Sequence, residues 1–133
     1  MRFVCLCYYN HAQFAAWTPA DLEEVGRICA PRDAELRATG RLILNSSLGE
    51  PQTARTLRAE KDGEARVTDG PYAESGESLG AMFVIEAEDL DDAVRIARIH
   101  PSSVLGRYIG GGIEVRPFDS FVLSAEQPAP IGS

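Results

Sequence analysis

Residues 2–9 and residues 80–87 form two nearly continuous apolar runs, and these runs set the strongest limit on the fold. Their length and their content of β-branched and aromatic side chains predict strands. Side chains on a strand point alternately to its two faces, so each of these strands is apolar on both faces. We therefore expect both strands to be central in a sheet and covered on each side.

A helix is predicted to begin at Pro19 and to end at Gly40. Thr18 is the expected N-cap, and a proline in the first turn is typical of helix starts. Pro31 lies inside this helix and predicts either a kink or a division into two shorter helices. Residues 10–19 are expected to form a loop.

A second helix is predicted after Asp89, which is its expected N-cap. Val94 and Ala97 contribute to a single apolar face of this helix. The helix is expected to end at His100, because a residue that precedes proline avoids the helical conformation.

The remaining segments predict short strands and connections. A hairpin with an Asp-Gly turn comes between the first helix and the second apolar run. A glycine-rich connection leads into the last strand. The expected ranges are 41–45 and 113–118 for single strands, 53–59 with 65–68 for the hairpin, and 106–112 for the connection.

The order of these elements predicts the fold class. With the hairpin set aside, the order is βαββαβ, the pattern of a ferredoxin-like α+β sandwich. We expect one such domain over residues 1–124 and a flexible tail over residues 125–133. Helices would cover only one face of the sheet. The other apolar face would exceed what monomers usually expose, so we expect a homodimer that packs sheet on sheet about a twofold axis.

The charge balance excludes some classes of partner. The chain has 20 acidic and 13 basic residues and a net charge of −7, so direct binding to nucleic acid is not expected. No window approaches the length of a membrane span, and the N-terminal apolar run is too short for a signal peptide. Three cysteines, an odd number, argue against a disulfide framework and predict a cytoplasmic protein.

Neither a metal nor a cofactor is expected. Cys5 and Cys7 would share one face of a strand, but further ligands at metal-site spacing are missing, so we expect small buried thiols. The chain has no phosphate loop, dinucleotide fingerprint or Gly-x-Ser-x-Gly motif.

A turn-forming segment, residues 69–80, comes directly before the second apolar strand. It reads Asp-Gly-Pro-Tyr-Ala-Glu-Ser-Gly-Glu-Ser-Leu-Gly, and its Gly-Pro pair keeps it out of helices and central strands. Together with residues 112–118, Gly-Ile-Glu-Val-Arg-Pro-Phe, it resembles the YCII-related family, specifically its Asp-Gly-Pro-Phe (DGPF) branch. The resemblance runs from Phe3 to Phe118.

The resemblance implies a ferredoxin-like fold that forms a dimeric α+β barrel, with a cleft between the sheet and the motif loop, residues 69–80. Members of the family are small bacterial proteins, mostly of unknown activity. Some are encoded beside alternative sigma factors, which implies a link to transcriptional regulation. A few relatives in the wider superfamily are lyase-like enzymes that act on aromatic compounds.

The chain departs from the family pattern at several positions. Tyr72 replaces phenylalanine in the motif, Ser75-Gly76 replaces Thr-Lys, and Ala81 replaces the second glycine. Enzymatic relatives resemble one another in a helix histidine that pairs with an aspartate, and Cys29 stands at that position here. The His–Asp mechanism of those relatives therefore lacks its histidine in this chain.

The motif loop supplies the acidic candidates. Asp69 could act as a general base or as a ligand acceptor, or it could cap its own turn. Glu74 and Glu77 are three residues apart and could form a carboxylate pair, or they could be solvated loop acids. Tyr72 adds a hydroxyl to the rim of the predicted cleft. With Arg116, these four residues are the ligand-binding candidates.

Two histidines and an arginine complete the candidates. His100 could act as a general acid, or it could cap the last carbonyls of its helix, where the dipole favours the protonated ring. His11 lies near a strand end, where pockets form, or is an exposed loop residue. Arg116 could bind an acidic ligand group, or it could pair with Glu114 on the same face of the last strand.

Two functions stay open. The first is a small-molecule-binding or accessory module that holds a small apolar or aromatic ligand. The alternative is a cofactor-free lyase or isomerase that transfers a proton with His100 or His11 and Asp69. A histidine and an acid inside one pocket would separate the two. We expect Asp69 and Tyr72 to border a cleft within reach of His100.

Overall fold

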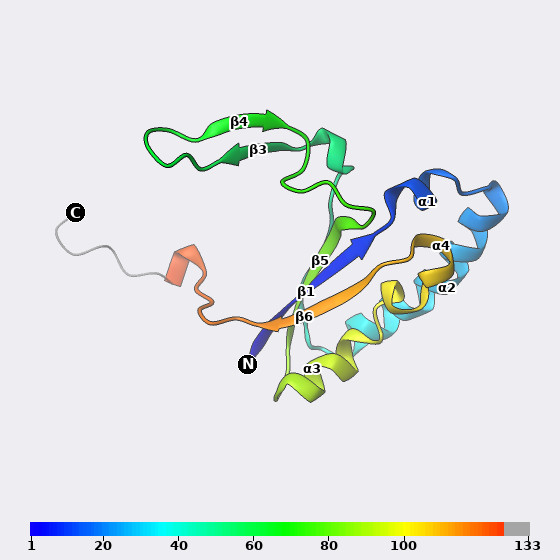
Figure 1. The fold of residues 1–133 in the computed structure, drawn as a ribbon. Coiled ribbons are helices and arrows are strands. Elements are labelled where there is room, and N and C mark those ends of the chain that lie inside the picture. The colour runs from blue at the N-terminus through cyan, green and yellow to red at the C-terminus, as the bar shows by residue number, and fades with distance from the viewer. Residues whose placement is uncertain (127–133) are drawn as a thin grey trace.

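A computed structural model describes residues 1–126, and in it two helices lie against one face of a four-stranded sheet (Figure 1). A separate two-stranded hairpin projects on the other side of the sheet (Figure 1). The strands are β1 (Arg2–Tyr9), β2 (Leu42–Ser47), β3 (Arg55–Arg58), β4 (Arg66–Asp69), β5 (Ser78–Glu86) and β6 (Gly112–Pro117). The helices are α1 (His11–Ala15), α2 (Pro19–Ala38), α3 (Leu90–Ala97) and α4 (Gly106–Ile109), with 3-10 turns η1 (Pro51–Thr53), η2 (Pro101–Val104) and η3 (Ser124–Glu126).

The sheet order is β2-β5-β1-β6, and all neighbouring strands are antiparallel. The two apolar runs, β1 and β5, are the two central strands, as predicted. The mixed α+β class and the inserted hairpin are confirmed, and the arrangement is compatible with the ferredoxin-like fold.

The core lies between the sheet and helices α2 and α3. Alternate residues of β1, namely Phe3, Cys5 and Cys7, are fully buried and face the helices. The predicted burial of the two thiols is thereby confirmed. Burial raises the pKa of Cys5 to about 12 and that of Cys7 to about 11, so both thiols stay protonated.

Helix α2 is continuous through Pro31, so the predicted alternative of two shorter helices is wrong. The proline is exposed, and it removes only one backbone donor from a 20-residue helix. Val25 and Leu36, on either side of it, are both buried, and each packs in a separate apolar cluster, so both halves of the helix are held in place. At the helix start, Thr18 and Asp21 form the reciprocal capping box.

Two connections contain helices that the sequence prediction missed. The segment predicted as a loop, residues 10–19, contains α1, because the Asn10 side chain accepts a hydrogen bond from the Gln13 backbone N–H. The glycine-rich connection contains α4. The two are joined where the Asn10 N–H donates to the Ile109 carbonyl at 2.7 Å.

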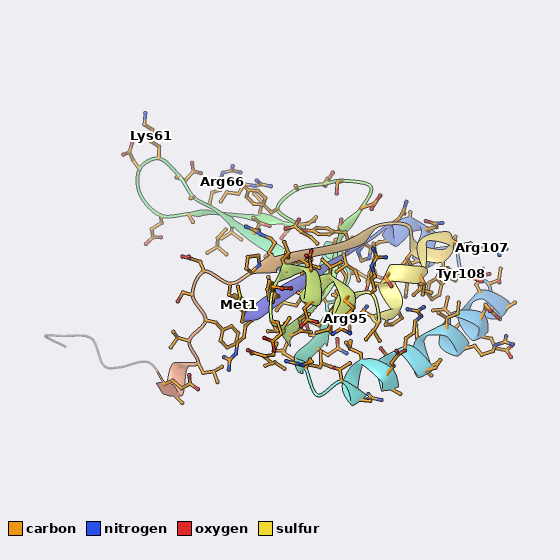
Figure 2. The ribbon with its side chains drawn as sticks, turned by 90° about the horizontal axis from the view of Figure 1, so that it is seen from below. Met1, Lys61, Arg66, Arg95, Arg107 and Tyr108 are labelled. Atoms are coloured by element: carbon orange, nitrogen blue, oxygen red, sulfur yellow. The ribbon has the colours of Figure 1, made fainter. Side chains whose placement is uncertain are left out.

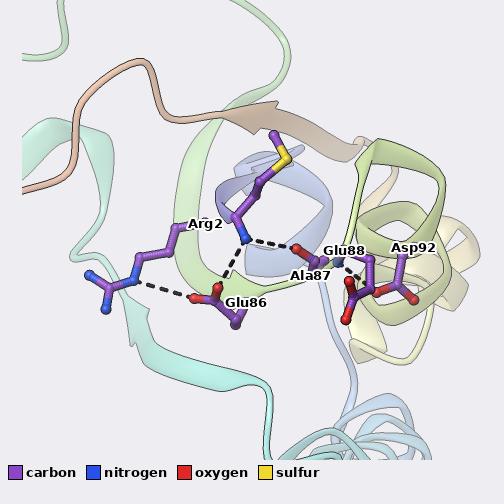
Figure 3. Close-up of polar contacts among 6 residues, drawn as sticks. Arg2, Glu86, Ala87, Glu88 and Asp92 are labelled. Atoms are coloured by element: carbon purple, nitrogen blue, oxygen red, sulfur yellow. Dashed lines mark hydrogen bonds and ion pairs between the residues drawn. The ribbon is translucent and has the colours of Figure 1, made fainter.

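The N-terminus is tied to the far end of β5 (Figure 3). The Met1 ammonium donates to Glu86 Oε1 and to the Ala87 carbonyl, both at 3.0 Å. Arg2 Nε lies 3.3 Å from the other oxygen of Glu86. These contacts join the first strand to the start of α3, where Asp89 is the N-cap as predicted.

The face of the sheet away from the helices, which we call the open face, carries apolar side chains at its centre. Val4, Leu6 and Met82 are half-buried there, and Leu44 on edge strand β2 is 45 % exposed. The expected apolar second face is therefore present. Of the predicted tail, residues 125 and 126 belong to η3, and residues 127–133 lie outside the described part of the chain.

Candidate functional site

A cavity of about 360 Å³ opens on the helix-covered side of the sheet, between α2, the ends of β1 and β2, and η2. We call it the polar cavity, because hydroxyl, thiol, imidazole and carboxylate groups converge on it. Its lining residues are Tyr9, Cys29, Asp33, Asn45, Ser46, Ser47, Ala81, His100, Pro101, Ser102 and Leu105.

Tyr9 brings a phenol hydroxyl to the cavity wall from the end of β1. Its oxygen lies 2.8 Å from Ser102 Oγ, which comes from η2. The ring lies against Gly80 so closely that a side chain there would overlap it. Burial, the largest cause, raises the pKa of Tyr9 to about 12, against the lowering effect of Ser102. Tyr9 therefore remains a neutral phenol at physiological pH.

His100 does not have the role expected from its place after α3. Its side chain is buried, its Nδ1 accepts the Ser102 backbone N–H at 3.1 Å, and its ring stacks on Phe83. Burial lowers the pKa of His100, against a smaller raising effect of Asp33. The ring is thus neutral with its proton on Nε2, an atom for which the described residues supply no partner.

The predicted capping of the α3 carbonyls by His100 is wrong. Arg32, from α2, lies at that end of α3 instead and donates to the carbonyls of Arg98 and Ile99 at 3.0 and 3.5 Å. A permanent cation at a helix C-terminus satisfies the free carbonyls without moving an imidazole out of the core.

Cys29 and Asp33 enter the polar cavity from α2. They are four residues apart and therefore lie on one face of the helix. Burial raises the pKa of Cys29, and Asp33 adds to that effect. Of the described residues that line the cavity, Asp33 alone carries a formal charge. Asp33 was not among the residues predicted from the sequence, where its spacing from Cys29 indicates only a shared helix face.

The motif loop borders a different cavity. A cleft of about 610 Å³, which we call the motif-loop cleft, lies between the loop and the ends of β1 and β2. Tyr8 contributes to it, whereas Tyr9 points into the polar cavity, as expected for consecutive strand residues. Its lining residues are Tyr8, Leu48, Gly49, Glu50, Pro51, Thr53, Ala54, Pro71, Tyr72, Ala73, Ser75, Glu77, Ser78 and Leu79.

Two of the ligand-binding candidates, Tyr72 and Glu77, line the motif-loop cleft. Asp69 does not line it: its exposed carboxylate pairs with Arg55 at 3.5 Å across the hairpin. Asp69, Tyr72 and His100 therefore do not meet in one cleft, contrary to the expected arrangement. His100 belongs to the polar cavity.

Glu74 and His11 share a third cavity, of about 280 Å³, beside the motif loop. His11 begins α1, and its Nε2 is buried without a hydrogen-bond partner among the described residues. Arg116 is elsewhere, on β6, where Arg116 Nε lies 3.5 Å from Glu114 Oε2. The pair with Glu114 is the alternative to ligand binding that the sequence predicted for Arg116.

Within residues 1–126, no helix has the length and apolar character needed to cross a membrane. The same residues contain no group of three or more histidine, cysteine or acidic side chains placed to hold a metal ion.

Comparison with known proteins identifies the family. The model of the YCII-related domain matches residues 1–118. An uncharacterized protein of Rhizobium meliloti (strain 1021) is 32 % identical over 121 residues, which cover 88 % of this chain and 91 % of the relative. The match spans the sheet, helices α2 and α3, and all three cavities. The chain therefore belongs to the YCII-related family.

Proposed function

We propose that this protein binds a small organic molecule in the polar cavity. The observation that carries the proposal is the hydrogen-bonded series Tyr9–Ser102–His100, which holds neutral polar groups at one wall of the cavity. Tyr9 and Ser102 have two hydroxyl protons, and only one of them is used in the hydrogen bond between the two residues. The other proton can be donated to a ligand, and the Nε2–H of His100 is a second such donor. Buried neutral donors with fixed geometry are typical of ligand sites.

The donor set favours a neutral ligand with carbonyl or hydroxyl oxygens. The cavity is lined by a carboxylate, Asp33, and by no arginine or lysine among its described residues. Carboxylate and phosphate ligands usually need such cations. Asp33 would accept a hydrogen bond from a ligand hydroxyl. This pattern suits a hydroxylated aromatic or a hydroxycarbonyl compound.

A second candidate function is cofactor-free proton transfer in the same cavity, as in a lyase or isomerase. The observation that favours it is that an acid and an imidazole, Asp33 and His100, line the same cavity. Asp33 would remove a proton from the ligand, and the Nε2–H of His100 would stabilise the negative charge that develops on oxygen. Asp33 thus takes the part that the sequence analysis assigned to Asp69.

We also propose that the chain is a homodimer with a dimeric α+β barrel, and that it belongs to the DGPF branch. The apolar open face supports the dimer. The Asp69-Gly70-Pro71-Tyr72 sequence supports the branch, although tyrosine replaces its phenylalanine. The link to sigma-factor regulation and the ligand role of the motif-loop cleft stay predictions.

Nuclear magnetic resonance titration with matched probes tests the binding proposal. Catechol, which is neutral, should shift the amide signals of Cys29, Ser47 and Ser102, and benzoate should bind at least about tenfold more weakly. Tyr9→Phe should weaken catechol binding by about three- to tenfold through the loss of one hydrogen bond. Tyr72→Phe, in the motif-loop cleft, is the control and should leave it unchanged. Shifts confined to Tyr72, Glu77 and Leu79 would overturn the assignment to the polar cavity.

Solvent-deuterium incorporation tests the enzyme alternative. A 1,3-diketone probe should gain deuterium faster with wild-type protein than in buffer if Asp33 removes a proton. Asp33→Asn should abolish the acceleration and keep the probe bound. No acceleration by the wild-type protein would remove this alternative and leave the binding function intact.

A further inference from the structure

We infer that the β3–β4 hairpin is an intersubunit arm, and that its Leu57–Val67 pair packs on a second copy of this chain. The arm comprises residues 54–70. The inference rests on the proposed homodimer and goes beyond it, because it gives the dimer a contact outside the packed sheets.

The arm has no core in its own subunit. β3 and β4 pair only with each other and do not join the four-stranded sheet. Figure 1 shows them on the side of the sheet opposite α2 and α3, and in Figure 2 Lys61 and Arg66 lie far from Tyr108 at the helical end. A two-stranded hairpin alone is marginally stable in water, so an arm of this kind needs a surface to pack on.

One apolar cross-strand pair is available for that surface. Leu57 and Val67 lie directly opposite each other, and they are 69 % and 59 % exposed. Such a pair stabilises a hairpin best when a further apolar group covers it. The neighbouring pair on the same face is Arg55 and Asp69, which bind each other and make a polar rim beside the apolar pair.

Hydrogen bonds order the base of the arm. The Gly70 N–H donates to the Ala54 carbonyl at 2.8 Å, and Thr56 Oγ1 donates to the Gly70 carbonyl at 2.9 Å. Arg58 donates to the Tyr72 carbonyl at 2.7 Å, and its guanidinium carbon lies 5.1 Å from the centre of the Tyr72 ring. These contacts close the base of the arm and tie it to the adjoining loop, which lowers the conformational entropy that the arm loses on binding.

Charge favours a second copy as the partner. Between residues 54 and 70 the chain has four basic and four acidic side chains, so the arm is neutral, whereas the rest of the protein carries the full net charge of −7. A neutral arm can approach another acidic subunit without repulsion. Each subunit also has an uncovered apolar surface on the same side of the sheet as the arm, namely the open face with Leu44 at its edge. A twofold dimer would cover both surfaces at once.

Sedimentation equilibrium of three proteins tests the arm. Wild-type protein is expected to dimerise, and Leu57→Lys should raise the dissociation constant of the dimer by about tenfold or more. Leu22→Lys is the matched control, since Leu22 is 63 % exposed on α2 at the helical side, and it should leave dimerisation unchanged.

Excision of the arm separates loss of contact from loss of folding. The ends at Ala54 and Gly70 are hydrogen-bonded, so residues 55–69 can be replaced by a two-glycine linker. The excised protein should keep the circular dichroism spectrum of the sheet and helices and should dimerise at least about tenfold more weakly. If the wild-type protein dimerises and neither Leu57→Lys nor excision weakens the dimer, the arm contact is overturned. The proposed dimer would not be affected by that result. A monomeric wild-type chain would overturn both the arm contact and the proposed dimer.

Discussion

Phe83 and His100 stack face to face, with ring centroids 4.4 Å apart and ring planes within 3° of each other. Phe83 comes from the centre of the sheet, and His100 follows α3. The stack buries the imidazole to 6 % exposure, and the Ser102 N–H holds it as a neutral acceptor. A protonated ring would lose this acceptor and remain buried in the core.

Stability should therefore fall as the solution becomes acidic. The pKa of His100 in the folded state is below its unfolded value of about 6.5. As pH falls through about 6.5, the unfolded chain binds a proton that the folded chain does not, so the free energy of unfolding decreases. Urea titrations between about pH 8 and pH 5.5 measure this slope.

The His100→Asn variant should remove that slope, because Asn keeps an acceptor near Nδ1 and does not titrate. It should also lower stability by about 1–3 kcal/mol at neutral pH through the loss of the stacked ring. His11→Gln is the matched control and should keep the slope. An unchanged slope in His100→Asn would contradict the assigned neutral state.

Cys29 should be the cysteine that alkylating reagents reach in the folded protein. Cys5 and Cys7 are fully buried, whereas Cys29 lines the open polar cavity. Because burial and Asp33 raise the pKa of Cys29, its reaction with iodoacetamide should be slow at neutral pH and should accelerate above about pH 9. Mass spectrometry should find one label on wild-type protein and none on folded Cys29→Ser. A second label before unfolding would contradict the burial of the β1 thiols.

Gly111 should tolerate no side chain, although its neighbour Gly112 should. Gly111 has φ +69°, and a Cβ there would overlap the Tyr8 carbonyl oxygen, which belongs to the backbone. Gly111→Ala should cost about 2–4 kcal/mol of stability. Gly112 has no atom within 4 Å of the corresponding Cβ, so Gly112→Ala should change stability by less than about 1 kcal/mol. Thermal denaturation of the pair checks the difference, and equal losses would contradict it.

Arg32 should contribute more to stability than Arg27 on the same helix. Arg32 donates to two carbonyls at the end of α3, whereas Arg27 forms an exposed ion pair with Glu24. Arg32→Ala should cost about 1–2 kcal/mol, and Arg27→Ala less than about 0.5 kcal/mol. Denaturant unfolding measures both losses of stability. An equal loss would show that water replaces Arg32 at the carbonyls of Arg98 and Ile99 without a cost in free energy.

Local sequence signals predicted the elements of the fold well. The strand over residues 2–9, the Thr18 cap and the Asp89 cap are all confirmed, because each depends on neighbours within a few residues. The Asn10 cap was a similar signal that the prediction missed. Pro31 was misjudged in part, because the packing of Val25 and Leu36 outweighs one lost backbone bond.

The candidate site was less predictable. His100 was predicted to be either a general acid or the cap of its helix, and the cap is made by Arg32 instead. Asp33 was missed, because an acid on a helix is usually a solvated residue, and only the fold places it in one cavity with Ser102 and Tyr9. Asp69 was favoured for its motif, yet its carboxylate faces solvent on the hairpin.

The α+β order, the two central apolar strands and the family suggested by residues 69–80 and 112–118 could all be derived from the sequence, since they depend on periodicity and short motifs. Tertiary structure alone decided which polar groups meet. Five residues from three separate segments meet in one cavity because α2 lies across the antiparallel sheet: Tyr9 from β1, Cys29 and Asp33 from α2, and His100 and Ser102 from η2 and its N-cap. Their protonation follows from burial, which no local pattern specifies.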